Sequence, residues 1–201
     1  MEEEKELIYS VRKIFLNYLK SRGMKSFNIP EYQRSYKWNA DTVGQLLDDL
    51  SRFRKGTGSE FYCLQNITVT NGVDCDHGYM NVIDGQQRLT TLFILLSFMQ
   101  RKWDEKILTA DAVFLKYSIR ESTHDFLQTK VLTGKIWDKP IQPKDAESKD
   151  EYYIMEVADA IRQWFEDYPE GISRETLLDD LRIIVNEVNS NEEETVFANL
   201  N

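Results

Sequence analysis

The stretch from Gly85 to about Trp103 is the most hydrophobic part of the chain, and it limits the possible folds more than any other. Its apolar residues fall on nearly every side of a helix rather than along one stripe: Leu89, Leu92, Phe93, Ile94, Leu95, Leu96, Phe98 and Met99. A helix that is apolar almost all round is buried on all sides. The sequence therefore predicts a fold in which other elements pack around this one helix.

The flanking segments predict a small β-sheet and further helices. Residues 61–70 and 79–83 are rich in aromatic and β-branched residues, and the polar loop between them starts at Asn71-Gly72, which predicts a β-hairpin. Shorter extended segments are expected at 27–30, near Tyr117 and at 182–188. Apolar spacing predicts helices over 7–19, 42–53 (capped by Asp41), 123–132, 151–167, 173–181 and from 192 onward. We therefore expect an α+β fold: a small sheet with a hairpin, a central buried helix and a helical C-terminal part.

Composition excludes several classes of protein. With 201 residues, of which 41% are hydrophobic and 12% aromatic, the chain can bury a core and is not largely disordered. Its longest apolar run, Leu92–Leu96, is far shorter than the roughly 20 residues that cross a bilayer. The acidic N-terminus lacks the features of a signal peptide, and two cysteines cannot form a disulfide framework. These features predict a cytoplasmic protein with no membrane partner.

The charge is unevenly distributed along the chain. The net charge is −9, and residues 141–201 alone carry 5 basic and 16 acidic side chains. This acidity argues against the last third holding a phosphate backbone, because affinity for nucleic acid depends on clustered cations. Residues 140–149 are polar, charged and contain proline, which predicts a linker or exposed loop. We therefore expect a core of residues 1–139 and an acidic helical extension of residues 140–201.

The first candidate motif is the segment Ile29–Trp38. It holds three aromatic residues, one lysine, Gln33 and Arg34. Arginine presents a planar fork that suits phosphate or carboxylate, and glutamine offers both a donor and an acceptor. The alternative is structural, with the aromatic side chains in the core or on the surface and Arg34 as an ion-pair partner.

The second candidate motif runs from Asn81 to Thr91. A strand is predicted to end at Ile83, Asp84-Gly85 to turn sharply, and a helix to begin at once. Backbone N–H groups at such a helix start attract anions, most often phosphate. The residues beside them are Gln86, Gln87, Arg88, Thr90 and Thr91. Asp84 could hold Mg²⁺, orient Arg88 or bind a sugar hydroxyl; alternatively, it caps the helix in a capping box with Gln87.

Together these motifs resemble a known family. Ile29-Pro-x-Tyr-Gln-Arg-x-Tyr-x-Trp38, followed by Val82-Ile-Asp-Gly-Gln-Gln-Arg-Leu-Thr-Thr-Leu92, is similar to the N-terminal domain of GmrSD-type restriction endonucleases, of the ParB/sulfiredoxin-like superfamily. The closing Val196-Phe-Ala-Asn-Leu-Asn201 resembles the F-x-x-L-N segment of that family. The resemblance covers nearly the whole chain.

The resemblance implies a ParB-like nucleotide-binding core in residues 1–139. The D-G-Q-Q-R motif of the family binds and turns over a nucleoside triphosphate (NTP), and the I-P-x-Y-Q-R motif lines the same pocket. Here this implies Asp84, Gln87 and Arg88 as catalytic residues, with Asp84 as an Mg²⁺ ligand. The implied nucleotide-binding residues are Tyr32, Gln33, Arg34, Gly85, Gln86, Thr90 and Thr91.

The resemblance also implies partners. A nuclease of the HNH type is expected to follow, in the same chain or in a partner subunit, in a system that restricts modified phage DNA. DNA contacts are expected through the full-length protein, and a homo-oligomer is compatible with the resemblance.

Two departures from the family pattern affect these expectations. The family commonly has F-L-G-x-I where this chain has Cys63-Leu-Gln-Asn-Ile67, so Gln65 is expected to narrow the pocket or change the accepted base. The chain also ends at Asn201, where relatives continue into an R-G turn and further helices. We therefore expect a truncated part of the module, with the missing segment able to complete the site.

Two other functions stay open from the sequence. The first is a DNA-binding module that senses modified bases without hydrolysis, in which Tyr32, Tyr36 and Trp38 stack on bases. The second is a scaffold or toxin–antitoxin partner in which the motif only shapes the start of a helix. That reading is favoured if Arg34 and Arg88 lie buried against carboxylates.

Overall fold

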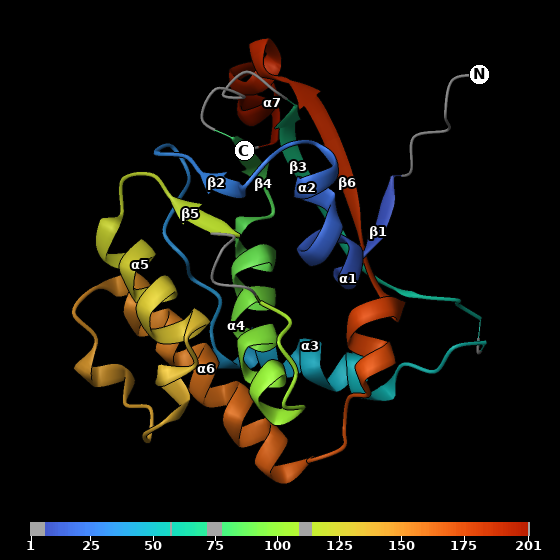
Figure 1. Ribbon diagram of the computed structural model, residues 1–201, viewed down its shortest axis with the longest axis vertical. Coiled ribbons are helices and arrows are strands. Elements are labelled where there is room, and N and C mark those ends of the chain that lie inside the picture. Colours follow the sequence, from blue (N-terminus) through green and yellow to red (C-terminus); the bar gives the residue numbers. More distant parts are fainter. Residues whose placement is uncertain (1–6, 57, 72–77, 109–113, 201) are drawn as a thin grey trace.

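The computed structural model describes residues 7–56, 58–71, 78–108 and 114–200 and folds them around one mixed β-sheet (Figure 1). The strands are β1 (Ile8–Ser10), β2 (Ser26–Ile29), β3 (Tyr62–Asn71), β4 (Tyr79–Asp84), β5 (Leu115–Tyr117) and β6 (Leu181–Asn189). The longer helices are α3 (Ala40–Arg52), α4 (Gln86–Lys102), α6 (Lys149–Asp167) and α7 (Glu193–Leu200).

Shorter helical segments complete the described fold. The N-terminal helix comprises α1 (Val11–Lys13), a π-helical turn η1 (Ile14–Tyr18) and α2 (Leu19–Ser21). Helix α5 (Glu121–Phe126) continues into the π-helical η3 (Leu127–Leu132), and η6 (Thr176–Asp180) precedes β6. Short 3₁₀ turns are η4 (Lys135–Trp137), η5 (Pro143–Asp145) and η7 (Ser190–Glu192).

The strand order is β1-β6-β3-β4-β2-β5. Strands β3 and β4 form the predicted antiparallel hairpin, with Val69 opposite Val82; residues 72–77 of its loop lie outside the described residues. Strand β4 pairs in parallel with β2, which pairs in parallel with β5. Strand β6 pairs in parallel with β3 and antiparallel with β1.

Helix α4 is the centre of the core, as its all-round hydrophobicity predicts. Its buried side chains include Leu92, Ile94 and Leu96, each with no exposed surface. Figure 1 shows α4 in the middle of the molecule, with α5 and α6 on one side of it and α3 behind. Helix α6 contacts both α3 and α4. The α+β prediction, with a small sheet, a hairpin and a central buried helix, is therefore confirmed.

Two local predictions are wrong. The first helix begins at Val11 rather than at residue 7, because residues 8–10 pair with β6 and Ser10 then caps the helix. Helix α3 is capped by Asn39, whose side chain accepts a hydrogen bond from the backbone N–H of Thr42 at 3.0 Å, and not by Asp41. Asp41 lies instead in the first turn, where a negative charge is favourable to the helix dipole.

The last third of the chain contributes to the sheet as well as to the helices. Strand β6 lies between β1 and β3, so residues 140–201 and residues 1–139 share one sheet. Within the described residues, no helix has both the length and the hydropathy needed to cross a membrane.

Candidate functional site

The junction between β4 and α4 requires a glycine. Gly85 has a φ of +94°, which is a left-handed conformation, and it occupies the N-cap position of α4. A Cβ atom at this position would lie 2.5 Å from Cγ2 of Ile67 on β3. No side chain caps the helix. The alternative in which Asp84 caps α4 in a capping box with Gln87 is therefore wrong, because Gly85 is the N-cap residue and provides no side-chain cap.

Asp84 instead orients Arg88. The Arg88 Nη2 donates to Asp84 Oδ2 at 2.8 Å and to the carbonyl oxygen of Asn66 at 2.6 Å, and Nη1 donates to Gln65 Oε1 at 3.0 Å. The Arg88 side chain is only 15% exposed. Its Nε is buried and has no partner in the part of the chain that the structure describes. Arg88 therefore keeps one unused donor at the start of α4.

Gln65 has a backbone conformation that is unusual for a residue with a side chain. It has a φ of +62°, in the left-handed region, where the strand pairing of β3 with β6 shifts between Cys63 and Asn66. Glycine adopts this conformation without strain, so the glycine that the family resemblance implies would fit this position. In this chain the Gln65 side chain reaches Arg88 instead.

Three glutamines hold the segment 30–38 against β4 and α4. Gln33 Nε2 donates to the carbonyl oxygens of Val82 and Ile83, at 3.2 and 2.6 Å. Gln87 Oε1 accepts from the backbone N–H groups of residues 37 and 38, at 2.8 and 3.2 Å, and its Nε2 donates to the carbonyl of residue 35 at 3.1 Å. These two side chains are nine-tenths or more buried, so their hydrogen bonds position the segment.

Gln86 is the third of these glutamines, and it is only half satisfied. Its Nε2 donates to the carbonyl oxygen of Arg34. Its Oε1 is buried and accepts no hydrogen bond from any described residue. The first turn of α4 thus contains an unused buried acceptor on Gln86 and an unused buried donor on Arg88.

Arg34 and Tyr32 have different surroundings. The Arg34 side chain is exposed, with no ion-pair partner among the described residues, and its backbone adjoins the first turn of α4 through Gln86. Tyr32 turns toward α7: its hydroxyl donates to Glu193 Oε1 at 2.5 Å and its ring centroid lies 4.5 Å from that of Phe197. Burial and the Glu193 carboxylate raise the pKa of Tyr32 above its usual value.

The two threonines lie in the core. Thr90 and Thr91 are fully buried, and their hydroxyls pair with those of Tyr117 at 2.8 Å and Tyr36 at 2.7 Å. Burial raises the pKa of both tyrosines. Tyr36 has no exposed surface, so it is not a stacking platform in this conformation. The predicted site residues therefore meet at the start of α4, except for Tyr32, Thr90 and Thr91.

One further residue lies at this site although no sequence motif indicates it. Arg120, just before α5, donates from Nη2 to the carbonyl oxygen of Gln33 at 2.9 Å and from Nη1 to that of Arg34 at 3.4 Å. It lies 86 residues from Arg34 in the sequence and belongs to no recognisable motif. Only the approach of α5 to the segment 30–38 identifies it.

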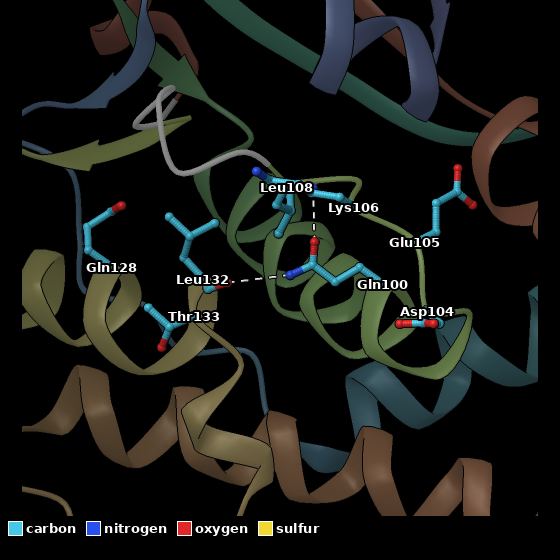
Figure 2. Close-up of a pocket in the computed structure, with 8 residues that line it drawn as sticks. All are labelled: Gln100, Asp104, Glu105, Lys106, Leu108, Gln128, Leu132 and Thr133. Atoms are coloured by element: carbon cyan, nitrogen blue, oxygen red, sulfur yellow. Dashed lines mark hydrogen bonds between the residues drawn. The ribbon is translucent and has the colours of Figure 1, made fainter.

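A separate cavity of about 590 Å³ lies beside the C-terminal half of α4 (Figure 2). Gln100 lines it, and its side chain accepts a hydrogen bond from the N–H of Leu108 at 3.0 Å and donates one to the carbonyl of Leu132 at 3.4 Å. None of the predicted site residues lines this cavity. Among the described residues, no three histidine, cysteine or carboxylate side chains gather as a metal site, so Asp84 stands alone as the predicted Mg²⁺ ligand.

The fold and this site define an α+β domain in which a strand–glycine–helix junction receives a second, arginine-bearing segment. The chain belongs to the family of the GmrSD restriction endonuclease N-terminal domain, whose model matches residues 11–201. A comparison with curated proteins finds no match. The condition that favours a scaffold is met in part, because Arg88 pairs with a carboxylate whereas Arg34 is exposed.

Proposed function

We propose that this domain binds a nucleoside triphosphate at the start of α4 and hydrolyses it, as the regulatory module of a modification-dependent restriction endonuclease in phage defence. The observation that carries the proposal is the pair of unused buried atoms, Gln86 Oε1 and Arg88 Nε. Native proteins leave few buried polar atoms unpaired, so such atoms indicate a missing ligand or water. The two atoms call for complementary partners: a phosphate oxygen suits the Arg88 Nε donor, and an O–H group such as that of a water molecule suits the Gln86 Oε1 acceptor.

The charge around the site supports the same ligand. Arg34, Lys37 and Arg88 belong to segments that meet at the first turn of α4, and Arg120 donates to the carbonyl of Arg34 beside them. The uncapped helix start adds backbone N–H donors and the positive end of the helix dipole. This cationic setting suits a triphosphate, although the chain as a whole carries a net charge of −9.

The proposed mechanism relies on electrostatic stabilisation. Arg88 and Arg34 neutralise charge on the phosphates, and Gln86 Oε1 orients a water molecule for attack on the terminal phosphorus. The bond from that phosphorus to the bridging oxygen breaks, the nucleoside diphosphate leaves, and the proton of the water passes to the released phosphate or to solvent. Asp84 is 41% exposed, and its Oδ1 accepts no hydrogen bond from the described residues, so that oxygen fits a single carboxylate contact to Mg²⁺. Bound Mg²⁺ would neutralise phosphate charge. Gln33 and Gln87 position the segment 30–38, and Thr90 and Thr91 support α4 from the core.

The wider role rests on family membership. We propose that NTP turnover here controls a nuclease of the HNH type, in the same chain or a partner subunit, and that DNA is contacted by the full-length protein in the cytoplasm. The family is described as a restriction endonuclease domain, which supports this setting.

Thermal unfolding against ATP, GTP, CTP and UTP, with and without Mg²⁺, tests the proposal. A ligand at about 100 times its Kd stabilises by roughly 2.7 kcal/mol, which raises the Tm of a domain of this size by about 5–10 °C. Arg34→Ala is expected to abolish this shift without changing the Tm of the free protein, because the Arg34 side chain is exposed. Arg88→Ala is expected to abolish the shift as well. In the wild-type protein, phosphate release then measures the turnover of each nucleotide that binds.

Arg52→Ala is the matched control, because Arg52 is an exposed arginine on α3 that pairs with Asp48. It is expected to retain the full nucleotide shift. A shift retained in both Arg34→Ala and Arg88→Ala would place the nucleotide elsewhere. The absence of a shift with any nucleotide, together with salt-sensitive DNA binding, would support the base-sensing alternative instead.

A further inference from the structure

We infer that Arg120 is a positioning residue of the site at the start of α4, held in place by Asp150. It clamps the backbone that carries Arg34 and so determines where the Arg34 guanidinium can reach. The inference rests on the proposed function, because it assigns Arg120 a role in nucleotide binding.

The clamp acts on two consecutive carbonyl oxygens. Arg120 Nη2 donates to that of Gln33 at 2.9 Å, and Nη1 donates to that of Arg34 at 3.4 Å. The carbonyl of Arg34 also accepts a hydrogen bond from Gln86 on α4. The backbone at Arg34 is therefore held from two sides, by the first turn of α4 and by the residue that precedes α5.

Asp150 on α6 orients the guanidinium of Arg120. It lies in the first turn of α6 and is only 2% exposed. Its Oδ2 lies 3.6 Å from Arg120 Nε and accepts a hydrogen bond from Thr123 Oγ1 at 3.0 Å. Its Oδ1 is buried without a partner among the described residues, so Arg120 is the cation on which this buried carboxylate depends.

The geometry needs an arginine. With Nε directed to Asp150, the two terminal nitrogens of the planar guanidinium are left for the two carbonyls. A lysine at this position keeps the positive charge near Asp150, but its single ammonium group cannot reproduce the fork. Arg120→Lys therefore keeps the positive charge that stabilises Asp150 and removes the paired hydrogen bonds that position Arg34.

The consequence is specific to Arg34. Its side chain has no partner among the described residues, so only its backbone determines its position. Without the hydrogen bonds of Arg120, Gln86 is the one described donor left to the Arg34 carbonyl, while Gln33 and Gln87 still hold the neighbouring residues. The segment 33–38 then samples more conformations, and fewer of them place the guanidinium beside a phosphate.

The test compares Arg120→Lys with wild type in amide hydrogen exchange and nucleotide affinity. Arg120→Lys is expected to speed exchange at the N–H groups of residues 35–38 and to weaken NTP binding by about tenfold. Arg101→Lys is the matched control, because Arg101 also joins a carboxylate, that of Asp138, to a carbonyl, that of Gly134, but in the last turn of α4. The control is expected to leave both quantities unchanged.

A double-mutant cycle with Arg34→Lys distinguishes positioning from a general loss of stability. If Arg120 acts through Arg34, the affinity losses of the two variants are non-additive, whereas their effects on Tm add. Unchanged exchange at residues 35–38 in Arg120→Lys, or fully additive affinity losses, would overturn the inference. A wild-type protein that binds no nucleotide contradicts the proposed function, whereas a binding wild type with unaltered affinity in Arg120→Lys contradicts only this inference.

Discussion

Gln65 shows how a single residue can be strained and still take part in a site. Its left-handed backbone lies where β3 shifts register against β6, and its side chain accepts a hydrogen bond from Arg88. The same short segment contributes the carbonyl of Asn66, which also holds Arg88. At this scale, the position of the arginine depends on a bulge in a neighbouring strand as much as on its own helix.

Replacing Gln65 by glycine is expected to maintain or raise stability. Relief of the left-handed strain contributes about 1 kcal/mol, which offsets the greater freedom of glycine in the unfolded chain and the loss of an exposed hydrogen bond. Gln45→Gly, an exposed position within α3, is the matched control and is expected to lower stability by about 1 kcal/mol. Urea unfolding measures both, and a Gln65→Gly protein as destabilised as Gln45→Gly would contradict the strain at this position.

Charged side chains of the N-terminal helix form ion pairs with η6 and β6, which lie near the other end of the chain. Arg12 on α1 donates to both carboxylate oxygens of Asp179 on η6, at 2.7 and 2.8 Å. Arg22, just after α2, donates to Glu187 on β6 at 2.6 Å, and the hydroxyl of Tyr18 donates to the same oxygen at 2.6 Å. These contacts hold a helix of poor regularity, interrupted by the π-helical turn η1, against the sheet.

The pair Arg12–Asp179 predicts a dependence of stability on pH. Its hydrogen bond to Arg12 holds the pKa of Asp179 below its usual range, and the nearby Arg174 and Lys55 act in the same direction. Because the unfolded carboxyl takes up its proton near pH 4, the stabilisation is fully present above that pH and is lost as the pH falls through the folded pKa.

Asp179→Asn is therefore expected to lower the free energy of unfolding by less than about 1 kcal/mol at pH 7, because the pair is partly exposed, and by progressively less below pH 4. Urea unfolding between pH 2.5 and pH 7 measures the difference. Glu60→Gln, which removes an exposed carboxylate, is the control. A difference from wild type that is constant over the whole range would show that the charge of Asp179 does not contribute.

At the scale of the whole molecule, the two ends of the chain depend on each other. Strand β6 lies between β1 and β3, and the buried Ile183 and Val185 extend the core beneath it. Helix α6 packs against α3 and α4, and its Asp150 approaches Arg120 at the candidate site. The site at the start of α4 therefore draws on residues from both sides of the boundary predicted after residue 139.

A fragment of residues 1–139 is accordingly expected not to fold by itself. Without β6, strand β1 loses the strand with which it pairs and β3 becomes an exposed edge; without α6, the apolar surfaces of α3 and α4 are uncovered. Circular dichroism during heating tests this, with residues 1–201 expected to melt in one cooperative transition. A cooperative transition in the shorter fragment would show that the predicted core is an independent unit.

Local patterns in the sequence were enough to predict several parts of this fold and site. The burial of α4, the hairpin of β3 and β4, and the helix that follows Asp84-Gly85 all depend on neighbouring residues, so periodicity and turn residues indicate them. That the two motifs line one pocket was implied by the resemblance to the GmrSD family, because neither motif by itself indicates the other. Their meeting is observed in the hydrogen bonds of Gln33, Gln86 and Gln87.

What the sequence determined by itself is which segments form the elements and which residue types are available at the start of α4. Only the tertiary structure decided what each side chain does there. The side-chain amides of Gln87 and Gln33 bind backbone groups 49 to 52 residues away, and Arg120 donates to a carbonyl 86 residues away. Hydrogen-bond partners are chosen by proximity in space, which depends on how distant segments pack. For the same reason, periodicity did not reveal that residues 8–10 pair with β6 before the first helix begins.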